Sequence, residues 1–495
     1  MNQWDFSSNA TTSYNLGQVC CGALLTLFGS TKVSLPGSTP YNSSAASYWS
    51  SQAASVQPAC VFTPSDTQDV SIALRALTTA EFITPDGNEP QQACRFAVRS
   101  GGHTSYAGAA SITGGVTVDL SSLKSIELSQ DRSTVSVDVG ARWQQVYEKL
   151  DPFNLTAVGG RNGLVGVGGL TTGGGISHLS PRAGWACDAV SNYEVVLADG
   201  SIVNANDDDP DLLFALRGGS NNFGIVTRVE LQTFKQGPLW GGQIYNPIST
   251  IDTVIKTLAA INSPDGYDEY ASLITAFGFS QGMVAIANDI EYTKNEANPS
   301  IFQPLMDLPS YLNSMRITNM SDIAAEMATF QPDGLRELYS AITVVSSVEM
   351  INATYLCFNK TVENIRDIPG IVWSVVLEPL PQLIYKRAPS GSNALGLSDR
   401  TQPLLIVLVS ATWQDETYDE KINQQTQVLM ADIEKEAHRL NAYDPFVYLN
   451  YAAPWQDPIA SYGKESIQRL QKVKTRVDPQ GVFTYNVPGG FKIPA

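Results

Sequence analysis

The 495-residue chain is short of positive charge, and it has no long apolar run. Lysine and arginine number 31 against 48 aspartate and glutamate residues, which gives a formal net charge of -17. Binding to nucleic-acid phosphates or to an anionic membrane surface requires clustered basic side chains, so we expect neither partner. A membrane-spanning helix requires about 20 apolar residues in succession, and the sequence contains no such run. With 43% hydrophobic and only 16% charged residues, the composition is typical of a packed globular enzyme.

The six cysteines are too few for a disulfide scaffold, and no Cys-x-x-Cys pair is present. We therefore predict no metal site. Cys20, Cys21, Cys60 and Cys94 lie near the N-terminus, where they either form one or two disulfides or remain buried free thiols. Disulfides would place the protein in an oxidising compartment. Six Asn-x-Ser/Thr sequons are consistent with a secreted glycoprotein. The N-terminus lacks the layout of a signal peptide, so we expect that signal to be missing from this sequence.

Sequence patterns divide the chain into four segments. An N-terminal extension covers residues 1–55, and the first lobe, residues 56–236, alternates short β-type runs with glycine clusters. Residues 237–442 contain fewer glycines and longer helical patterns, which predict a separate lobe. The tail, residues 443–495, begins with a loop-rich aromatic stretch and continues into a helix.

Capping and turn signals predict individual elements of the first lobe. Ser65 with Gln68 forms a capping box and predicts a helix that begins there. A hairpin with a glycine-containing turn is expected over residues 193–203. Asp209-Pro210 predicts the start of a helix that ends before Gly218. These patterns indicate an α+β lobe whose glycines lie between elements, where loops contact a ligand.

Three glycine clusters stand out, at residues 99–108, 159–175 and 216–224. Backbone without side chains lets successive N–H groups point into one concavity, and such nests bind pyrophosphate. This chemistry suits a dinucleotide even in an acidic protein. A nicotinamide-type Rossmann fingerprint fails on spacing, because Thr171 stands where the third glycine is required. Flexible loops are the plain alternative, but each cluster is flanked by β-type sequence.

These clusters resemble the motifs of a known enzyme family. They read Arg-Ser-Gly-Gly-His at 99–103 with Gly108, Val-Gly-Val-Gly-Gly at 165–169 followed by three glycines at 173–175, and Arg-Gly-Gly-Ser-Asn-Asn-Phe-Gly-Ile-Val at 217–226. The chain is similar in these positions to the FAD-linked oxidases of the vanillyl-alcohol oxidase / p-cresol methylhydroxylase (PCMH) superfamily. Tyr448-Leu449-Asn450-Tyr451 in the tail is similar to the C-terminal signature of its berberine-bridge-enzyme-like branch, here of the fungal, secreted type.

The resemblance implies both a fold and a cofactor. The fold would be α+β: a two-subdomain PCMH-type FAD-binding domain, an α/β substrate domain with a large antiparallel sheet, and a C-terminal segment that returns to the FAD domain. His103, one of only three histidines, matches the residue that in this family bonds covalently to the 8α-methyl carbon of the flavin. The alternative is a hydrogen-bonding histidine beside a noncovalent flavin. Asn162 stands where many relatives have a second linking residue, a cysteine, so we expect a single link.

The residues expected to contact the FAD are Arg99, Ser100, Gly101, Gly102, His103, Thr104, Ser105, Gly108, Asn162, Gly166, Gly168, Gly169, Gly173, Gly174, Gly175, Ile225 and Asn450. All of them belong to the motifs that carry the resemblance.

The same resemblance suggests two catalytic positions. Val165 matches a gate residue near flavin C4a, where valine leaves room for dioxygen; a plain core valine is the alternative. Tyr448 is the candidate proton acceptor, although a phenol would need a lowered pKa for that work, and a packing role is the alternative. Ile176 and Leu408 stand where plant relatives have polar groups, so we expect a more apolar pocket. His178 is expected in a loop, or else in the pocket.

Taken together, the sequence predicts a secreted FAD-dependent oxidase that acts on a small organic substrate, an alcohol or a related secondary metabolite. Hydride would pass from the substrate to covalently bound flavin, and O2 would be reduced to H2O2. The alternatives are an oxidative cyclase or dehydrogenase of secondary metabolism, or a carbohydrate oxidase on the same fold. A binding protein with a vestigial flavin site would have degraded glycine motifs, and these are intact.

Overall fold

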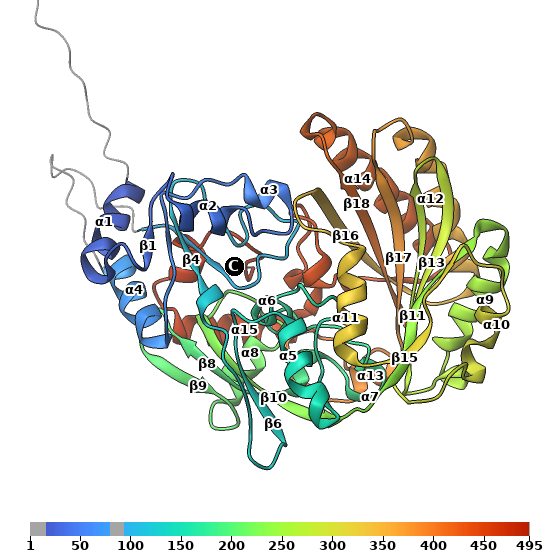
Figure 1. Ribbon diagram of the computed structural model, residues 1–495, viewed down its shortest axis with the longest axis horizontal. Helices are drawn as coiled ribbons and strands as arrows, with labels where there is room; N and C mark the ends of the chain where they lie inside the picture. The colour runs from blue at the N-terminus through green and yellow to red at the C-terminus, as the bar shows by residue number, and fades with distance from the viewer. Residues whose placement is uncertain (1–15, 80–93, 495) are drawn as a thin grey trace, which may run out of the picture.

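The computed structural model describes residues 16–79 and 94–494, and it consists of two lobes and a C-terminal tail (Figure 1). The first lobe contains two sheets. The smaller has the order β1-β2-β4-β3, with strands Val33–Ser34, Cys60–Phe62, Val116–Asp119 and Phe96–Arg99. β4 runs parallel to both β2 and β3, and β1 is antiparallel to β2.

The second sheet of the first lobe is antiparallel and has the order β5-β6-β10-β8-β9, with β7 paired to β10. Its strands are Ile126–Leu128, Thr134–Asp138, Ile225–Lys235, Val190–Val196, Ile202–Ala205 and, for β7, Leu155–Ala157. β8 and β9 form the predicted hairpin around Gly200. The predicted helix after it is α8 (Pro210–Leu216), and the side chain of Asp209 caps its first turn by accepting from Leu212 N.

Two disulfides fasten the N-terminal segment to this lobe. Cys20 and Cys21, in α1 (Leu16–Phe28), pair with Cys94 and Cys60, so the paired arrangement of these cysteines is confirmed. Because β1 also belongs to the smaller sheet, the segment with α1 and β1 packs as part of the first lobe.

The capping prediction for the next helix is wrong in detail. α4 spans Thr67–Thr79, and the backbone N–H of Asp69 donates to Oδ1 of Asp66 at 2.8 Å. The N–H of Ser65 donates in turn to Oδ2 of Asp69. The carboxylate of Asp66, one residue after Ser65, therefore caps the helix.

The second lobe is built on the predicted large antiparallel sheet. It has nine strands in the order β14-β11-β13-β12-β17-β18-β16-β19, with β15 paired to β11. In that order the strands are Leu312–Asn313, Leu239–Pro247, Met283–Tyr292, Ala271–Ser280, Val372–Leu380, Leu404–Trp413, Arg336–Val345 and Tyr443–Asp444, and β15 is Arg316–Thr318.

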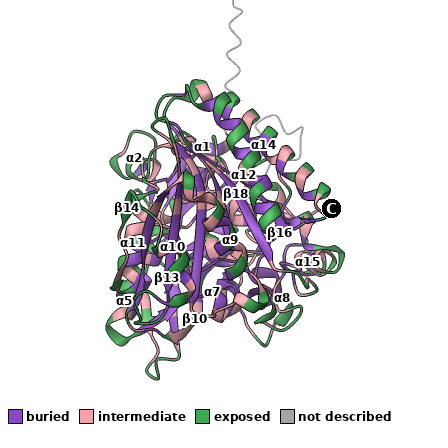
Figure 2. Cartoon of the chain, turned by 90° about the vertical axis from the view of Figure 1, so that its right-hand side faces the viewer, coloured by how far each residue is buried: buried purple, intermediate pink, exposed green. Residues whose placement is uncertain are grey.

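Long amphipathic helices cover the outer face of this sheet. They are α9 (Ile251–Ile261), α12 (Val348–Ile365) and α14 (Asp419–Arg439). Their buried faces join the inner strands in one apolar core that includes Phe277, Phe358 and Trp373. Figure 2 shows the buried strands behind helices whose outer surfaces are exposed. The other face of the sheet is turned toward the first lobe, where Tyr339 and Leu408 pack with Trp49 of the first lobe.

The C-terminal tail returns to the first lobe, as predicted. α15 (Lys464–Val477) lies against α8, with ion pairs of Arg469 to Asp211 and Arg476 to Asp209 at 2.8 Å. Farther along, Asn486 donates to the carbonyl of Cys94. Along the described chain we find no helix with the length and apolar character that crossing a membrane requires.

Candidate functional site

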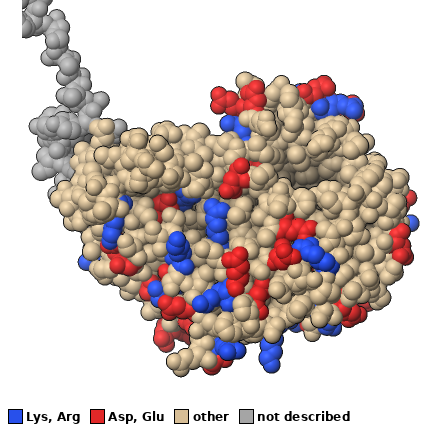
Figure 3. Space-filling model, viewed as in Figure 1, with Lys and Arg blue, Asp and Glu red and all other residues tan. Residues whose placement is uncertain are grey.

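The two lobes and the tail enclose a cavity of about 450 Å³. Its walls come from all three glycine clusters, from the inner face of the nine-stranded sheet and from both the start and the end of the tail. On the surface shown in Figure 3, basic side chains alternate with acidic ones and form no continuous basic area. A cavity with glycine-rich backbone on one side and side chains on the other suits a dinucleotide with a small molecule beside it.

Two glycine clusters approach each other closely at the cavity wall. A Cβ added to Gly101 would lie 2.6 Å from the Cα of Gly166, so only glycine permits this contact. Ser100 accepts a hydrogen bond from Gly168 N at 3.3 Å and donates to the carbonyl of Val139. The backbones of both clusters therefore face the same space.

Arg99 anchors the start of the first glycine cluster to the rest of the lobe and does not line the cavity. Its guanidinium is buried, donates to the carbonyls of Ser44 and Ser47 at 2.6 and 2.7 Å, and forms an ion pair with Asp119. It also stacks on the ring of Tyr48. Both terminal nitrogens of the guanidinium are engaged by protein, so the predicted contact of Arg99 with the cofactor is not found in the lining.

His103 lies in the cavity wall, stacked on Trp49 with ring centroids 4.4 Å apart and planes 6° apart. Within the described chain its Nε2 is buried without a hydrogen-bond partner. Burial lowers the pKa of His103 to about 3, so the imidazole is neutral. A neutral, unpartnered ring nitrogen beside glycine-rich backbone fits the FAD that the motifs imply.

The structure brings most of the predicted contact residues to the cavity. The lining includes Ser100, Gly101, Gly102, His103, Thr104, Ser105, Asn162, Val165, Gly166, Gly168, Gly169, Ile225, Tyr448 and Asn450. Ile176 and Leu408, the two positions expected to be apolar, also line it.

Gly108 and the triplet Gly173, Gly174 and Gly175 do not line the cavity. The triplet instead allows the tail to pack closely. A Cβ on Gly173 would lie 2.1 Å from Oδ1 of Asn450, and Gly174 and Gly175 have φ values of +109° and +90°. These glycines position the tail, and their predicted contact with the cofactor is not found in the lining.

Tyr448 is buried at the point where the tail meets the triplet. Its hydroxyl accepts hydrogen bonds from Gly175 N at 3.1 Å and from Asn450 Nδ2 at 3.0 Å. Burial raises the pKa of Tyr448, whereas base catalysis by the phenolate would require a lowered one. The condition set for a basic Tyr448 is therefore not met, and the phenol keeps its proton at neutral pH.

A buried polar cluster beside Tyr448 was missed by the sequence reasoning. Nη2 of Arg161 lies 2.8 Å from Oε2 of Glu378, and the hydroxyl of Tyr451 donates to Oε1 of Glu378 at 2.9 Å. Arg161 also donates to the Tyr451 hydroxyl. All three line the cavity. Two signals could have found this cluster: an arginine inside a glycine motif, and a lone carboxylate in the apolar strand β17.

The sheet face toward the cavity carries an apolar row and a polar row. Strand registers place Tyr245, Ala287, Ala276, Val376 and Leu408 side by side across five strands. The polar row lies two residues away along each strand, on the same face of the sheet. In it Gln243 pairs with Asp289, and Glu378 belongs to the same row. The prediction of a more apolar pocket therefore holds for the centre of the sheet, and the polar row corrects it at one end.

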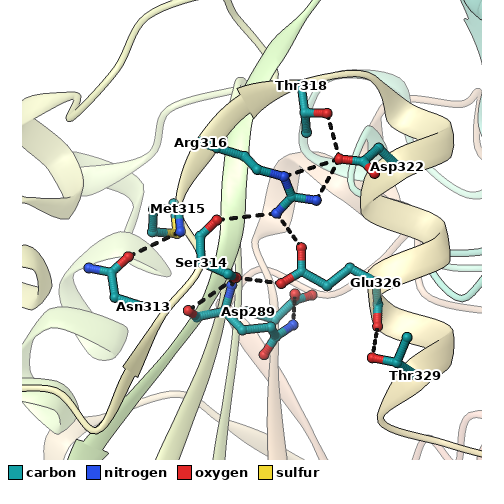
Figure 4. Close-up of polar contacts among 10 residues, drawn as sticks. Asp289, Asn313, Ser314, Met315, Arg316, Thr318, Asp322, Glu326 and Thr329 are labelled. Carbon is teal, nitrogen blue, oxygen red and sulfur yellow. Dashed lines mark hydrogen bonds and ion pairs between the residues drawn. The ribbon is translucent and has the colours of Figure 1, made fainter.

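A clamped helix completes the wall. α11 (Met320–Thr329) and the residues after it contribute Met327, Phe330 and Gln331 to the lining. Figure 4 shows Arg316 between Asp322 and Glu326 of this helix, with Ser314 donating to Glu326 beside Asp289. Asn162 of the first lobe donates to Gln331 at 3.1 Å. The position at which many relatives have a second linking residue is thus occupied here by a contact between lobes.

Comparison with known proteins agrees with this architecture. The FAD binding domain family matches residues 58–206, and the berberine and berberine-like family matches residues 447–488. Among curated proteins, the chain is 37% identical to the FAD-dependent monooxygenase tpcD of Cochliobolus heterostrophus over 91% of this chain and 88% of that one. It is 31% identical to the bifunctional solanapyrone synthase of Alternaria solani, over 98% and 91%.

One similar protein is much longer than this chain. The oligopeptidase PhomG' of Diaporthe leptostromiformis is 42% identical over 94% of this chain, but the match spans only 37% of that protein. Among solved structures, 6-hydroxy-D-nicotine oxidase of Arthrobacter nicotinovorans has a TM-score of 0.77 at 21% identity, over 94% and 97% of the two chains. Berberine bridge enzyme of Eschscholzia californica has 0.74 at 16%, over 96% and 99%. At these identities the structures establish the fold alone.

Proposed function

The chain belongs to the berberine bridge enzyme-like family of FAD-binding oxidoreductases, and from this premise we propose that it is an oxidase with FAD linked once, through His103. The observation that carries the proposal is the environment of His103. Its ring is neutral, stacked on Trp49 and unpartnered at Nε2 among the described residues, in the wall formed by the glycine clusters. Asn162 offers no thiolate for a second link.

Bound FAD would accept two electrons from the substrate as hydride and pass them to O2, which gives H2O2. The chain's own residues would orient the substrate and manage its proton. Arg161 holds the carboxylate of Glu378 in place, and Glu378 lines the same cavity as Tyr448. We assign proton acceptance to Glu378.

Tyr448 takes a different part in this proposal. Its hydroxyl accepts two hydrogen bonds, and no described residue accepts its proton. The hydroxyl can donate a hydrogen bond to an oxygen of the substrate and orient it, while Glu378 takes the proton of the substrate. Val165, in the same cavity wall, would leave room for O2.

The apolar row of the sheet indicates the kind of substrate. Tyr245, Ala287, Ala276, Val376 and Leu408 offer few hydrogen bonds, which a carbohydrate with many hydroxyls would need. We therefore propose a largely apolar secondary metabolite with an oxidisable hydroxyl group. An oxidative cyclase is the second candidate, since the solanapyrone synthase of Alternaria solani is similar over nearly the whole chain.

The test is a substrate panel of polyketide-type alcohols, phenols and oligosaccharides. For an oxidase we expect anaerobic bleaching of the flavin by an apolar alcohol, then release of one H2O2 per product when air is admitted. Mass spectrometry in 18O2 separates this outcome from the activity named for tpcD, because a monooxygenase retains labelled oxygen in its product. Labelled product, or bleaching by oligosaccharides alone, would refute the proposal.

A further inference from the structure

A buried cluster of three titratable side chains includes Asp289 of the polar row of the sheet. Asp289 and Glu291 are two residues apart in β13, so both point to the same face of the sheet. His178 approaches them from the loop that follows the glycine triplet of the first lobe. The exposed fractions of the three are 6%, 0% and 2%.

The three side chains converge on one point. One nitrogen or oxygen atom from each lies within 4.8 Å of the others. Nδ1 of His178 is 2.8 Å from Oε2 of Glu291 and 3.3 Å from the hydroxyl of Ser272. Neighbouring donor atoms at such distances can share one central ion.

Several atoms of this cluster lack hydrogen bonds. Among the residues that the structure describes, Oε1 of Glu291 and Oδ2 of Asp289 receive no hydrogen bond, and Oε2 of Glu291 has its close contact with Nδ1 of His178 but no hydrogen bond. Gln243 donates to the other oxygen of Asp289. Buried carboxylates are normally paired, hydrogen-bonded or bound to a metal. The guanidinium of Arg161 is engaged by Glu378 and Tyr451.

We propose that His178, Asp289 and Glu291 bind a divalent first-row metal ion such as Zn²⁺ or Mn²⁺. The set of one imidazole and two carboxylates suits such ions, and three protein ligands leave a coordination position open. Two negative charges would balance the charge of the ion. The expectation of no metal rested on the spacing of cysteines alone, and this cluster contains none.

The site would lie at the wall of the main cavity, because Asp289 is also one of the lining residues. An oxygen atom of a bound substrate could then occupy the open position. The metal proposal stands on the cluster itself and is independent of the proposed oxidase activity. A protein without metal can still be an oxidase, and a protein with metal need not be one.

Elemental analysis of the full-length holoenzyme tests the proposal. The protein is incubated separately with Zn²⁺ and Mn²⁺, dialysed against metal-free buffer and analysed for bound metal. We expect about one ion per chain for at least one metal. Glu291→Gln should reduce binding to background. Glu337→Gln, which alters a buried carboxylate outside the cluster, should leave it unchanged. Flavin absorbance confirms that each variant is folded.

Thermal unfolding separates metal binding from the competing explanation, in which the two carboxyl groups share a proton. Metal binding predicts that the ion raises the unfolding temperature of the parent and leaves that of Glu291→Gln unchanged. Proton sharing predicts no effect of metal on either protein. Absence of bound metal from the parent after both incubations, or equal binding by Glu291→Gln, would overturn the proposal.

Discussion

Arg161 and Glu378 come from different lobes, 217 residues apart in sequence, and meet in a buried ion pair at the cavity wall. Arg161 belongs to the second glycine cluster, in the first lobe, and Glu378 lies near the end of β17, in the second lobe. Tyr451 of the tail donates to the same carboxylate. The pair therefore joins all three parts of the chain at the place where the substrate is expected.

Replacing one member of this pair should destabilise the protein, and replacing both members should restore most of the lost stability. Arg161→Met leaves a buried carboxylate without its cation, and we expect a loss of roughly 3–5 kcal/mol in the free energy of unfolding. The double variant Arg161→Met with Glu378→Leu should recover most of that loss, because a hydrophobic pair of similar volume fits such sites. Urea unfolding of the parent and the variants measures this. A double variant less stable than Arg161→Met would contradict it.

The covalent link is tested by acid precipitation. The flavin should remain with the precipitated parent protein, and it should be released from His103→Ala. The matched control is His438→Ala, since His438 lies on α14 with its side chain largely exposed. Release of free FAD from the parent would show that the link is absent.

Val165→Leu should slow reoxidation of the reduced flavin by O2. Val165 lines the cavity between Asn162 and Gly166, and one additional methylene would fill space there. Because photoreduction can reduce the flavin without a substrate, stopped-flow mixing with oxygenated buffer gives the rate directly. Val165→Ala, which enlarges the space, is the control and should react at least as fast as the parent. Equal reoxidation rates for the parent and Val165→Leu would show that Val165 does not control access of O2.

The elements of this fold were largely predictable, but contacts between distant segments were not. The helix of the tail was readable because its pattern is local, whereas the cysteines gathered near the N-terminus left disulfides and free thiols as alternatives. His103 was found because it stands inside a short motif. Glu378 and Asp289 were missed, since each lies in a largely apolar strand and only strand register brings them to the cavity. Local sequence also could not show that the glycine triplet serves the tail.

Tyr448→Phe should slow anaerobic flavin reduction and leave the flavin bound. The variant loses the hydrogen bond that the proposal directs to the substrate, and removal of one such positioned donor typically costs roughly 10² to 10³ in rate. Tyr462→Phe is the matched control, because this buried phenol donates to the carbonyl of Gly218 outside the cavity. The measurement uses the best substrate of the panel. If both variants reduce at the parent's rate, Tyr448 has only a packing role.

The stability of the protein should fall as pH rises through the neutral range, and Glu337 should be one cause. This carboxyl group is 2% exposed in β16, and its partner is the hydroxyl of Thr412 at 2.8 Å. Burial raises the pKa of Glu337 to about 8 from the ordinary value of 4.5. Between these two values the folded state binds the proton and the unfolded state does not, so each pH unit costs up to about 1.4 kcal/mol of stability.

Glu337→Gln removes this dependence, because the amide stays neutral at every pH. The variant and the parent should unfold at similar temperatures at pH 5, and the variant should unfold at the higher temperature at pH 8. Glu363→Gln, on the exposed face of α12 with its side chain 69% accessible, should follow the parent at both values. Differential scanning calorimetry at the two pH values gives the comparison. The unfolding temperatures of Glu337→Gln and the parent could instead differ by the same amount at pH 5 and pH 8. Glu337 would then already be ionised in the folded protein, and the hydroxyl of Thr412 would donate to a carboxylate.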